Sequence, residues 1–107
     1  MVDAHRLAEE RSLSLHRLIA ERLRDDPSIL EHARETVQRW RADGRAPFYA
    51  EAWEGVLASP LDHICEVLVC DSEESRALRQ ATPFAGAIGA RERWRIWAEV
   101  REGHGTR

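Results

Sequence analysis

Apolar residues recur every three or four positions along most of the chain, which is the spacing of one face of an α-helix. The first stripe of this kind lies between Asp3 and about Arg24, where two arginines, Arg11 and Arg22, interrupt it. Its apolar members are Ala4, Leu7, Ala8, Leu15, Leu18, Ile19 and Leu23. No stretch alternates apolar and polar residues over the length of a β-strand. The pattern therefore predicts an all-α protein.

Turn-forming residues divide the remaining pattern into separate helices. Asp26-Pro27 is expected to end the first helix and to start the second, with Ser28 to Glu31 as a capping box. Asp43-Gly44 should end this second helix, because glycine is common just beyond a helix C-terminus. The apolar face of the second helix is the cleanest in the chain, and we expect Leu30 and Trp40 on it to be buried. The face consists of Ile29, Leu30, Ala33, Val37 and Trp40.

Further helices are expected beyond Pro47. The segment from Phe48 to Ala58 has near-helical apolar spacing, and Ser59-Pro60 is a start signal for the next helix. Asp71 to Glu74 should cap a short helix, and Thr82 to Gly89 is the one extended loop before the final helix. The apolar positions of these segments are Tyr49, Trp53, Val56, Leu57, Leu61, Ile64, Cys65, Leu68, Ala77 and Leu78.

Length and composition fit one domain. The chain has 107 residues, of which 43% are hydrophobic and 33% charged, and this is enough to form a core without disulfides or metals. We therefore expect a single compact domain of five or six short helices over residues 1–107, with its core at about 12–102 and a short tail at 103–107. No apolar run approaches a membrane-spanning length, and no apolar export signal follows Met1. A cytoplasmic protein without membrane contact is expected.

The final predicted helix, from Ala90 to Glu102, has the sequence ARERWRIWAEVRE. Arginine interleaved with tryptophan can bind a phosphate backbone and stack on bases. The formal net charge of −3 argues against a dedicated nucleic-acid binder. On a helical wheel Trp94, Ile96, Trp97 and Val100 share one side, and we expect the tryptophans to face the core. The opposite side carries Arg91, Glu92, Arg95, Glu99 and Glu102.

Three arginines, Arg11, Arg22 and Arg93, lie within apolar arcs, where a charged side chain needs a partner. In one interpretation each arginine extends to the edge of its stripe or pairs with an acidic residue of a neighbouring helix. In the other, these faces are incompletely covered within one molecule and anchor a second protein, because arginine and tryptophan are enriched at interface centres. The second interpretation assigns partner binding to Arg11, Arg22, Arg93, Trp94 and Trp97.

Residues with catalytic or metal-binding chemistry occur without a recognisable spacing. Lysine is absent, which excludes a P-loop, a Schiff base and a lysine base. Cys65 and Cys70 point in different directions on a helix and are expected to be small buried hydrophobes rather than zinc ligands. His16 is expected to be a half-buried surface histidine, and Ser12-Leu13-Ser14 to supply helix-breaking or capping residues. Gly86 to Gly89 could receive an anion, although a connecting turn is favoured. We expect no catalytic site, metal or cofactor, and therefore no enzyme.

Two segments carry a resemblance to a known group of proteins. SLSLHRLIAERLRDDPSILEHARETVQRW and PLDHICEVLVCDSEESRALRQATPFAGAIGARERWRIWAEVRE resemble small bacterial helical proteins in which a Ser-Leu-x-Leu-His-Arg helix, an Arg-Trp second helix and a Pro-Phe-Ala-Gly loop before a Glu-Arg-Trp helix follow in this order. The resemblance covers about Ser12 to Glu102, and such sequences are similar to antitoxins of toxin-antitoxin operons. It implies a cognate toxin encoded nearby, of the nucleotidyltransferase type, that the protein neutralises by occlusion.

Two other functions remain as alternatives. The first is a DNA-associated transcriptional regulator, although the chain shows no N-terminal helix-turn-helix region of the kind that sometimes precedes these antitoxins. DNA binding is therefore expected to be weak, or to require the complex. The second alternative is a small helical enzyme, either a hydrolase or a transferase. A homo-oligomer is compatible with all three functions.

Overall fold

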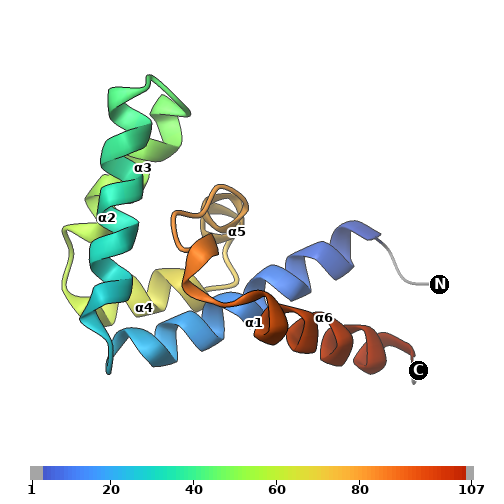
Figure 1. Cartoon of the computed structure of the whole chain (residues 1–107). Coiled ribbons are helices and arrows are strands. Elements are labelled where there is room, and N and C mark those ends of the chain that lie inside the picture. Colours follow the sequence, from blue (N-terminus) through green and yellow to red (C-terminus); the bar gives the residue numbers. More distant parts are fainter. Residues whose placement is uncertain (1–3, 106–107) are drawn as a thin grey trace.

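Six α-helices and one turn of 3-10 helix account for most of residues 4–105, which are the residues that the computed structural model describes (Figure 1). For residues 104 and 105 it describes only the helical backbone. The elements are α1 (Ala4–Leu23), α2 (Pro27–Ala42), α3 (Pro47–Leu57), α4 (Leu61–Val69), α5 (Glu73–Gln80), η1 (Ala85–Ala87) and α6 (Ala90–Gly105). No β-strand occurs within these residues, and the predicted all-α class is confirmed.

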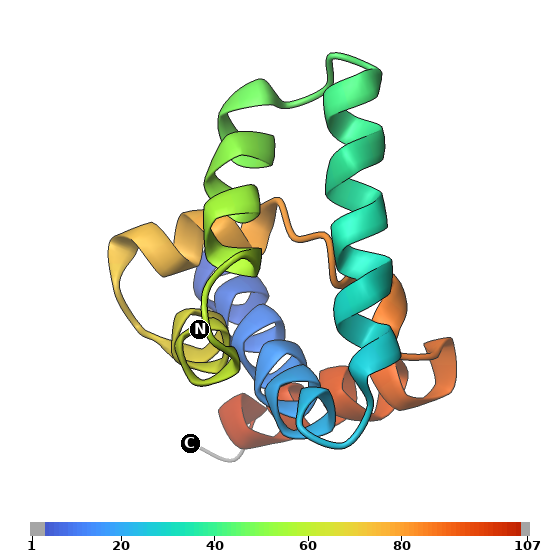
Figure 2. The same cartoon turned by 90° about the vertical axis from the view of Figure 1, so that its left-hand side faces the viewer.

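α1 is the helix on which the rest of the fold is assembled. α4 and α5 pack against it, and α6 runs antiparallel beside it to form a two-helix arm (Figure 1). α2 and α3 form a second, upright arm that rises from the C-terminal end of α1 (Figure 2). α5 lies in the corner between the two arms. The chain therefore folds into an L-shaped body in which α6 packs chiefly on a single neighbour, α1.

The core lies where α1, α3, α4 and the loop before α6 meet. Trp53 of α3 is fully buried, and its ring packs edge-on against Phe84, with 5.8 Å between the ring centroids. Its indole N–H donates to the carbonyl oxygen of Ala81 at 2.8 Å, so the polar atom of this buried ring is satisfied. The other large apolar side chains that are fully buried are Ile19, Ile64, Leu68, Phe84 and Ile88.

Most helix ends follow the predicted signals, although α4 has Pro60 as its N-cap and lacks a side-chain cap. The hydroxyl of Ser72 accepts a hydrogen bond from the backbone in the first turn of α5, as predicted, and Gly44 follows α2 with a φ of 67°. The predicted capping box at Ser28 to Glu31 is wrong. The N-cap of α2 is Asp26, whose carboxylate accepts hydrogen bonds from the backbone N–H and the hydroxyl of Ser28 at 3.1 and 2.6 Å. Because Pro27 takes the first helical position, Ser28 already lies inside the helix.

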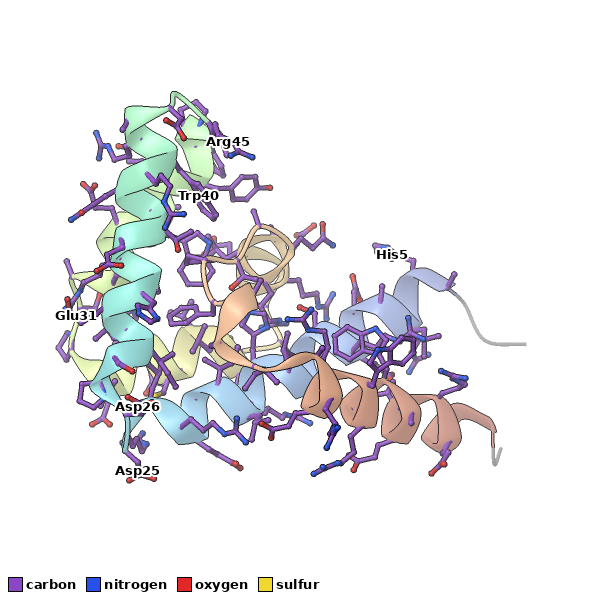
Figure 3. All side chains as sticks on the ribbon, in the orientation of Figure 1. His5, Asp25, Asp26, Glu31, Trp40 and Arg45 are labelled. Atoms are coloured by element: carbon purple, nitrogen blue, oxygen red, sulfur yellow. The ribbon has the colours of Figure 1, made fainter. Side chains whose placement is uncertain are left out.

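The apolar face of α2 is buried at its centre but not at its edges. Ile29, Ala33 and Val37 are buried, whereas Leu30 and Trp40 are only half-buried, which contradicts their predicted burial. α2 has α3 as its main neighbour, so the edges of its apolar face are covered only in part. Figure 3 shows Trp40 toward the free end of the upright arm, close to the α2–α3 turn. No helix in residues 4–105 is long and apolar enough to cross a membrane.

Candidate protein-binding surface

Arg22 has a partner inside the molecule. Its two terminal nitrogens donate to both carboxylate oxygens of Glu92, one bond measuring 2.9 Å, and this pair joins the end of α1 to the start of α6. The hydrogen bonds lower the pKa of Glu92 and raise that of Arg22, because they favour the charged forms. Glu92 therefore faces α1, and its predicted place on the outward side of the final helix is wrong. Arg22 fits the interpretation in which such arginines pair with a neighbouring helix.

Arg93 fixes the loop that precedes its own helix. Its guanidinium donates to the carbonyl oxygens of Ala85 at 2.9 Å and Ile88 at 3.1 Å. Both acceptors belong to the segment predicted as the loop between Thr82 and Gly89, part of which forms η1. This charged side chain satisfies carbonyl groups that the short turn leaves without helical partners. The contacts support the favoured interpretation of this segment as a connecting turn.

Arg11 contacts an aromatic ring and, unlike Arg22 and Arg93, has a buried nitrogen without a hydrogen-bond acceptor among the described residues. Its guanidinium lies over the ring of Trp97, with 5.8 Å from the guanidinium carbon to the ring centroid, and so connects α1 to α6 by a cation–π contact. Its Nε atom is buried and has no hydrogen-bond partner among the described residues. The structure thus brings Arg11 and Trp97 together, but leaves hydrogen-bond donors of this half-buried side chain without an acceptor.

Trp94 lies on the outside of α6. Its side chain is 68% exposed, whereas Trp97 is half-buried and Ile96 is buried, so the predicted core position of Trp94 is wrong. Trp94 is about 160° around the helix from Ile96, which is a wider arc than the single neighbour α1 can cover. Three exposed arginines share α6 with Trp94, and none of them makes an ion pair with a described residue. They are Arg91, Arg95 and Arg101.

These residues form one candidate surface, which we call the arginine–tryptophan face. It consists of Arg11, Arg91, Trp94, Trp97 and Arg101. Positions three, four and seven residues apart lie on one side of a helix, so Arg91, Trp94, Trp97 and Arg101 follow the same side of α6. Arg11 joins them from α1 through its contact with Trp97. The face thus combines an exposed indole, a half-buried indole and several cations.

His16 lies in a buried polar site that the sequence did not predict. The side chain is 1% exposed, so its expected position as a half-buried surface residue is wrong. Its Nδ1–H donates to the carbonyl oxygen of Ser12 at 2.7 Å, and its Nε2 accepts from the hydroxyl of Thr82 at 2.9 Å. That hydroxyl oxygen accepts in turn from the backbone N–H of Phe84 at 3.1 Å. Burial lowers the pKa of His16 to about 4, and the charge of Arg79 adds to this effect.

The same region corrects the interpretation of the serines. Ser12 and Ser14 lie in the middle of α1, so they neither break nor cap the helix.

Arg79 of α5 is 4% exposed and donates to the carbonyl oxygens of Leu68 at 3.2 Å and Cys70 at 2.7 Å. It thereby satisfies carbonyl groups at the C-terminal end of α4. Burial lowers the pKa of Arg79, which is nevertheless held in place by these two acceptors.

The two cysteines have different environments. Cys65 is buried as predicted, and burial raises the pKa of its thiol, which donates to the carbonyl oxygen of Ala20 at 3.7 Å. Cys70 is exposed, which contradicts the prediction that it is a buried hydrophobe, because it follows the last residue of α4. Within residues 4–105 no group of three or more His, Cys, Asp or Glu side chains could hold a metal ion.

A hollow of about 260 Å³ between α2 and the loop before α6 brings together the residue types of an acid–base site, Asp26, Ser28 and His32. The hydroxyl of Ser28 donates to Asp26, and the same carboxylate caps α2. These hydrogen bonds lower the pKa of Asp26, because they favour the carboxylate. The hydroxyl proton is therefore directed to a carboxylate that serves as a helix cap, which is the arrangement of a structural contact.

Comparison of the chain with protein-family models, with curated proteins and with solved structures finds no match. Among the predicted partner-binding residues, Arg11, Trp94 and Trp97 lie on the arginine–tryptophan face. Arg22 and Arg93 are engaged within the molecule.

Proposed function

We propose that this protein acts by binding another protein, and that it is an antitoxin for a toxin encoded beside it. The resemblance of Ser12 to Glu102 to bacterial antitoxins motivates the second part of the proposal. It also motivates a toxin of the nucleotidyltransferase type. The proposed activity requires no cofactor and no catalytic group, and it takes place in the cytoplasm. Binding alone would be sufficient, because an occluded active site cannot receive its substrate.

The observation that supports protein binding most directly is the exposure of Trp94. A large aromatic side chain that is 68% exposed beside a half-buried Trp97 leaves apolar surface in contact with water. Burying a large apolar side chain contributes about 1.5–3 kcal/mol, and a partner that covers Trp94 would gain part of this free energy. Arginine and tryptophan are also the residues that most often dominate the binding free energy of protein interfaces.

The mechanism we propose is occlusion by a surface that is already formed before binding. α6 is held against α1 by the Arg22–Glu92 pair and by the Arg11–Trp97 contact, so its position does not depend on the partner. A preformed surface avoids the cost of ordering a flexible segment when the complex forms. The arginine–tryptophan face would cover the active site of the toxin or hold it in an inactive arrangement.

Co-expression tests this proposal. The adjacent gene is placed under an inducible promoter, with and without the gene for this protein, and growth and co-purification are followed. We expect the neighbouring gene alone to arrest growth, and co-expression to restore growth and to give a complex that purifies together. Harmless expression of the neighbour, with no complex, would refute the antitoxin proposal.

One observation favours a second candidate, the DNA-associated regulator. Arg91, Arg95 and Arg101 are exposed on the same helix as Trp94, and arginines around an exposed aromatic ring also suit a nucleic acid. The formal net charge of −3 opposes this function, because it repels a polyanion from the molecule as a whole. We therefore rank a protein partner above DNA.

A further inference from the structure

The buried and half-buried arginines of this protein differ in whether their guanidinium groups have hydrogen-bond acceptors. Residues 4–105 contain six arginines that are not exposed, and five of them donate hydrogen bonds to carboxylate or carbonyl oxygens. These five are Arg22, Arg34, Arg76, Arg79 and Arg93. Arg11 is the sixth, and its buried Nε atom has no acceptor among the described residues. A buried donor without an acceptor costs about 1–3 kcal/mol. Arg11 is thus the one of these six arginines whose guanidinium is not committed to an acceptor among the described residues.

The contact with Trp97 presents Arg11 in a form suited to a planar anion. The guanidinium carbon of Arg11 lies 5.8 Å from the centroid of the Trp97 ring, and a guanidinium carries its N–H donors in a planar, rigid fork. Two parallel N–H groups of such a guanidinium match the two oxygens of a carboxylate. Arg11 is half-buried rather than enclosed, so part of its side chain meets solvent. The arrangement therefore suits one carboxylate group of a partner.

The charges around this pair favour an acidic partner. Glu92 is neutralised by Arg22, whereas Arg91 and Arg101, which lie within about 60° of Trp94 around α6, make no ion pair with a described residue. Glu99 and Glu102 lie about 140° and 80° around α6 from Trp94, away from the centre of the arginine–tryptophan face. The face is thus locally cationic on a chain whose formal net charge is −3. Such a difference in sign directs an acidic segment to this face in preference to the rest of the surface.

We propose that the arginine–tryptophan face binds an acidic segment of a partner protein, with one carboxylate held by Arg11 beside Trp97 and an apolar side chain covering Trp94. This inference deepens the proposed function and rests on it for the identity of the partner. A protein segment fits the face better than a nucleic acid. It offers both a carboxylate for Arg11 and an apolar side chain for Trp94. It also carries fewer negative charges than a nucleic acid, so the negatively charged protein repels it less.

A peptide-binding measurement tests the inference separately from the toxin. The probe is a fluorescein-labelled twelve-residue peptide of alternating glutamate and leucine, and its comparison peptide has glutamine in place of every glutamate. Fluorescence anisotropy should show binding of the glutamate peptide by the whole protein and at least tenfold weaker binding of the glutamine peptide. Arg11→Gln should weaken binding of the glutamate peptide at least tenfold. Arg17→Gln is the matched control, because Arg17 is an exposed arginine of α1 and should leave binding within twofold.

Three results would overturn the inference. They are no binding of the glutamate peptide, equal binding of the two peptides, and tighter binding of single-stranded oligothymidylate than of the glutamate peptide. Arg11→Lys keeps the charge but loses the paired N–H groups, and it should also weaken binding, whereas full retention would contradict carboxylate recognition. If the neighbouring protein binds Arg11→Gln as well as wild type, the carboxylate inference fails and the proposed function stands. If the peptide binds through Arg11 but no complex forms with the neighbour, the proposed function fails and the inference stands.

Discussion

Arg11, Arg22 and Arg93 occupy equivalent positions in the sequence pattern but have different partners in the folded chain. Arg22 donates hydrogen bonds to Glu92, and Arg93 donates to two backbone carbonyls, so both stabilise the packing of α6. Arg11 has an aromatic ring and no acceptor for its buried Nε atom. The two interpretations of these arginines therefore apply to different residues. A helical wheel cannot separate them, because it shows the face of a residue and not the atoms opposite that face.

His16 leads to a prediction about pH. Its pKa is about 4 in the folded chain, below the ordinary value of 6.5, so the unfolded chain binds more protons between these two values. The free energy of unfolding should therefore fall as the pH is lowered from about 6.5 to 4, by up to about 3 kcal/mol from this residue. Urea unfolding at a series of pH values measures this decrease.

A variant assigns the pH dependence to this histidine. His16→Asn can keep a donor toward Ser12 but cannot take up a proton, so its stability should vary less between pH 6.5 and 4 than that of the wild type. The variant should be less stable than wild type at pH 7, because the site is buried. An NMR titration in which His16 gains its proton near pH 6.5 would contradict the argument.

At the scale of helices, periodicity and capping residues were sufficient to predict the elements. The predicted segments match α1 to α6 because each has an apolar stripe and a recognisable start or stop, such as Ser72 or Gly44. The errors occur where a stripe is wider than its neighbours can cover. Trp94 and Trp40 both lie at the edge of an apolar arc on a helix with one main neighbour. The number of neighbours that a helix has is set by the tertiary structure. It cannot be predicted from the apolar stripe of that helix alone.

The missed contacts have a similar cause. His16 meets Thr82, which is 66 residues away in the sequence, and Arg93 meets carbonyls in a turn whose shape no local motif specifies. Arg79 is buried although it is charged, because the carbonyls of Leu68 and Cys70 lie beside it. Of the candidate surface, the sequence predicted Arg11, Trp94 and Trp97 as partner-binding residues, but not that Trp94 is exposed. For Arg22 it offered both interpretations, and the pair with Glu92 agrees with the one that places its partner inside the molecule.

The role of Arg93 in fixing the loop before α6 can be measured by stability. Arg93→Ala removes hydrogen bonds to the carbonyls of Ala85 and Ile88, and it should lower the free energy of unfolding by about 1–2 kcal/mol. Arg95→Ala is the matched control, because Arg95 is exposed on the same helix, and it should change stability by less than about 0.5 kcal/mol. Equal stability of the two variants in urea unfolding would show that the loop does not depend on Arg93.

At the scale of the whole molecule, net charge limits what the protein can bind alone. The formal charge of −3 opposes a DNA backbone, although the arginine–tryptophan face is locally cationic. We therefore predict no tight binding of the isolated protein to the DNA upstream of its own gene in a gel shift. Any retention should disappear as salt rises from about 50 to 200 mM, because a few arginine–phosphate contacts are strongly salt-dependent. Salt-resistant and sequence-specific retention would favour the regulator instead.

The L shape places two exposed aromatic rings on different arms, which provides an internal comparison. Trp94 is 68% exposed on α6, and Phe48 is 74% exposed at the start of α3. The start of α3 lies at the free end of the upright arm, near Arg45 in Figure 3. Both rings can be removed with little loss of core packing, because neither is buried. The proposed function assigns partner binding to Trp94 and no role in binding to Phe48.

The central claim is tested most directly by two variants of this protein, Trp94→Ala and Phe48→Ala. The quantity to measure is the affinity of each variant for the protein encoded by the adjacent gene. Titration calorimetry would measure the dissociation constants, and thermal unfolding would verify that both variants melt close to wild type. We predict that Trp94→Ala weakens the complex by about 2 kcal/mol or more, which is roughly 30-fold, and that Phe48→Ala leaves it within about twofold. Wild-type affinity of Trp94→Ala, or a loss of affinity confined to Phe48→Ala, would contradict binding through the arginine–tryptophan face.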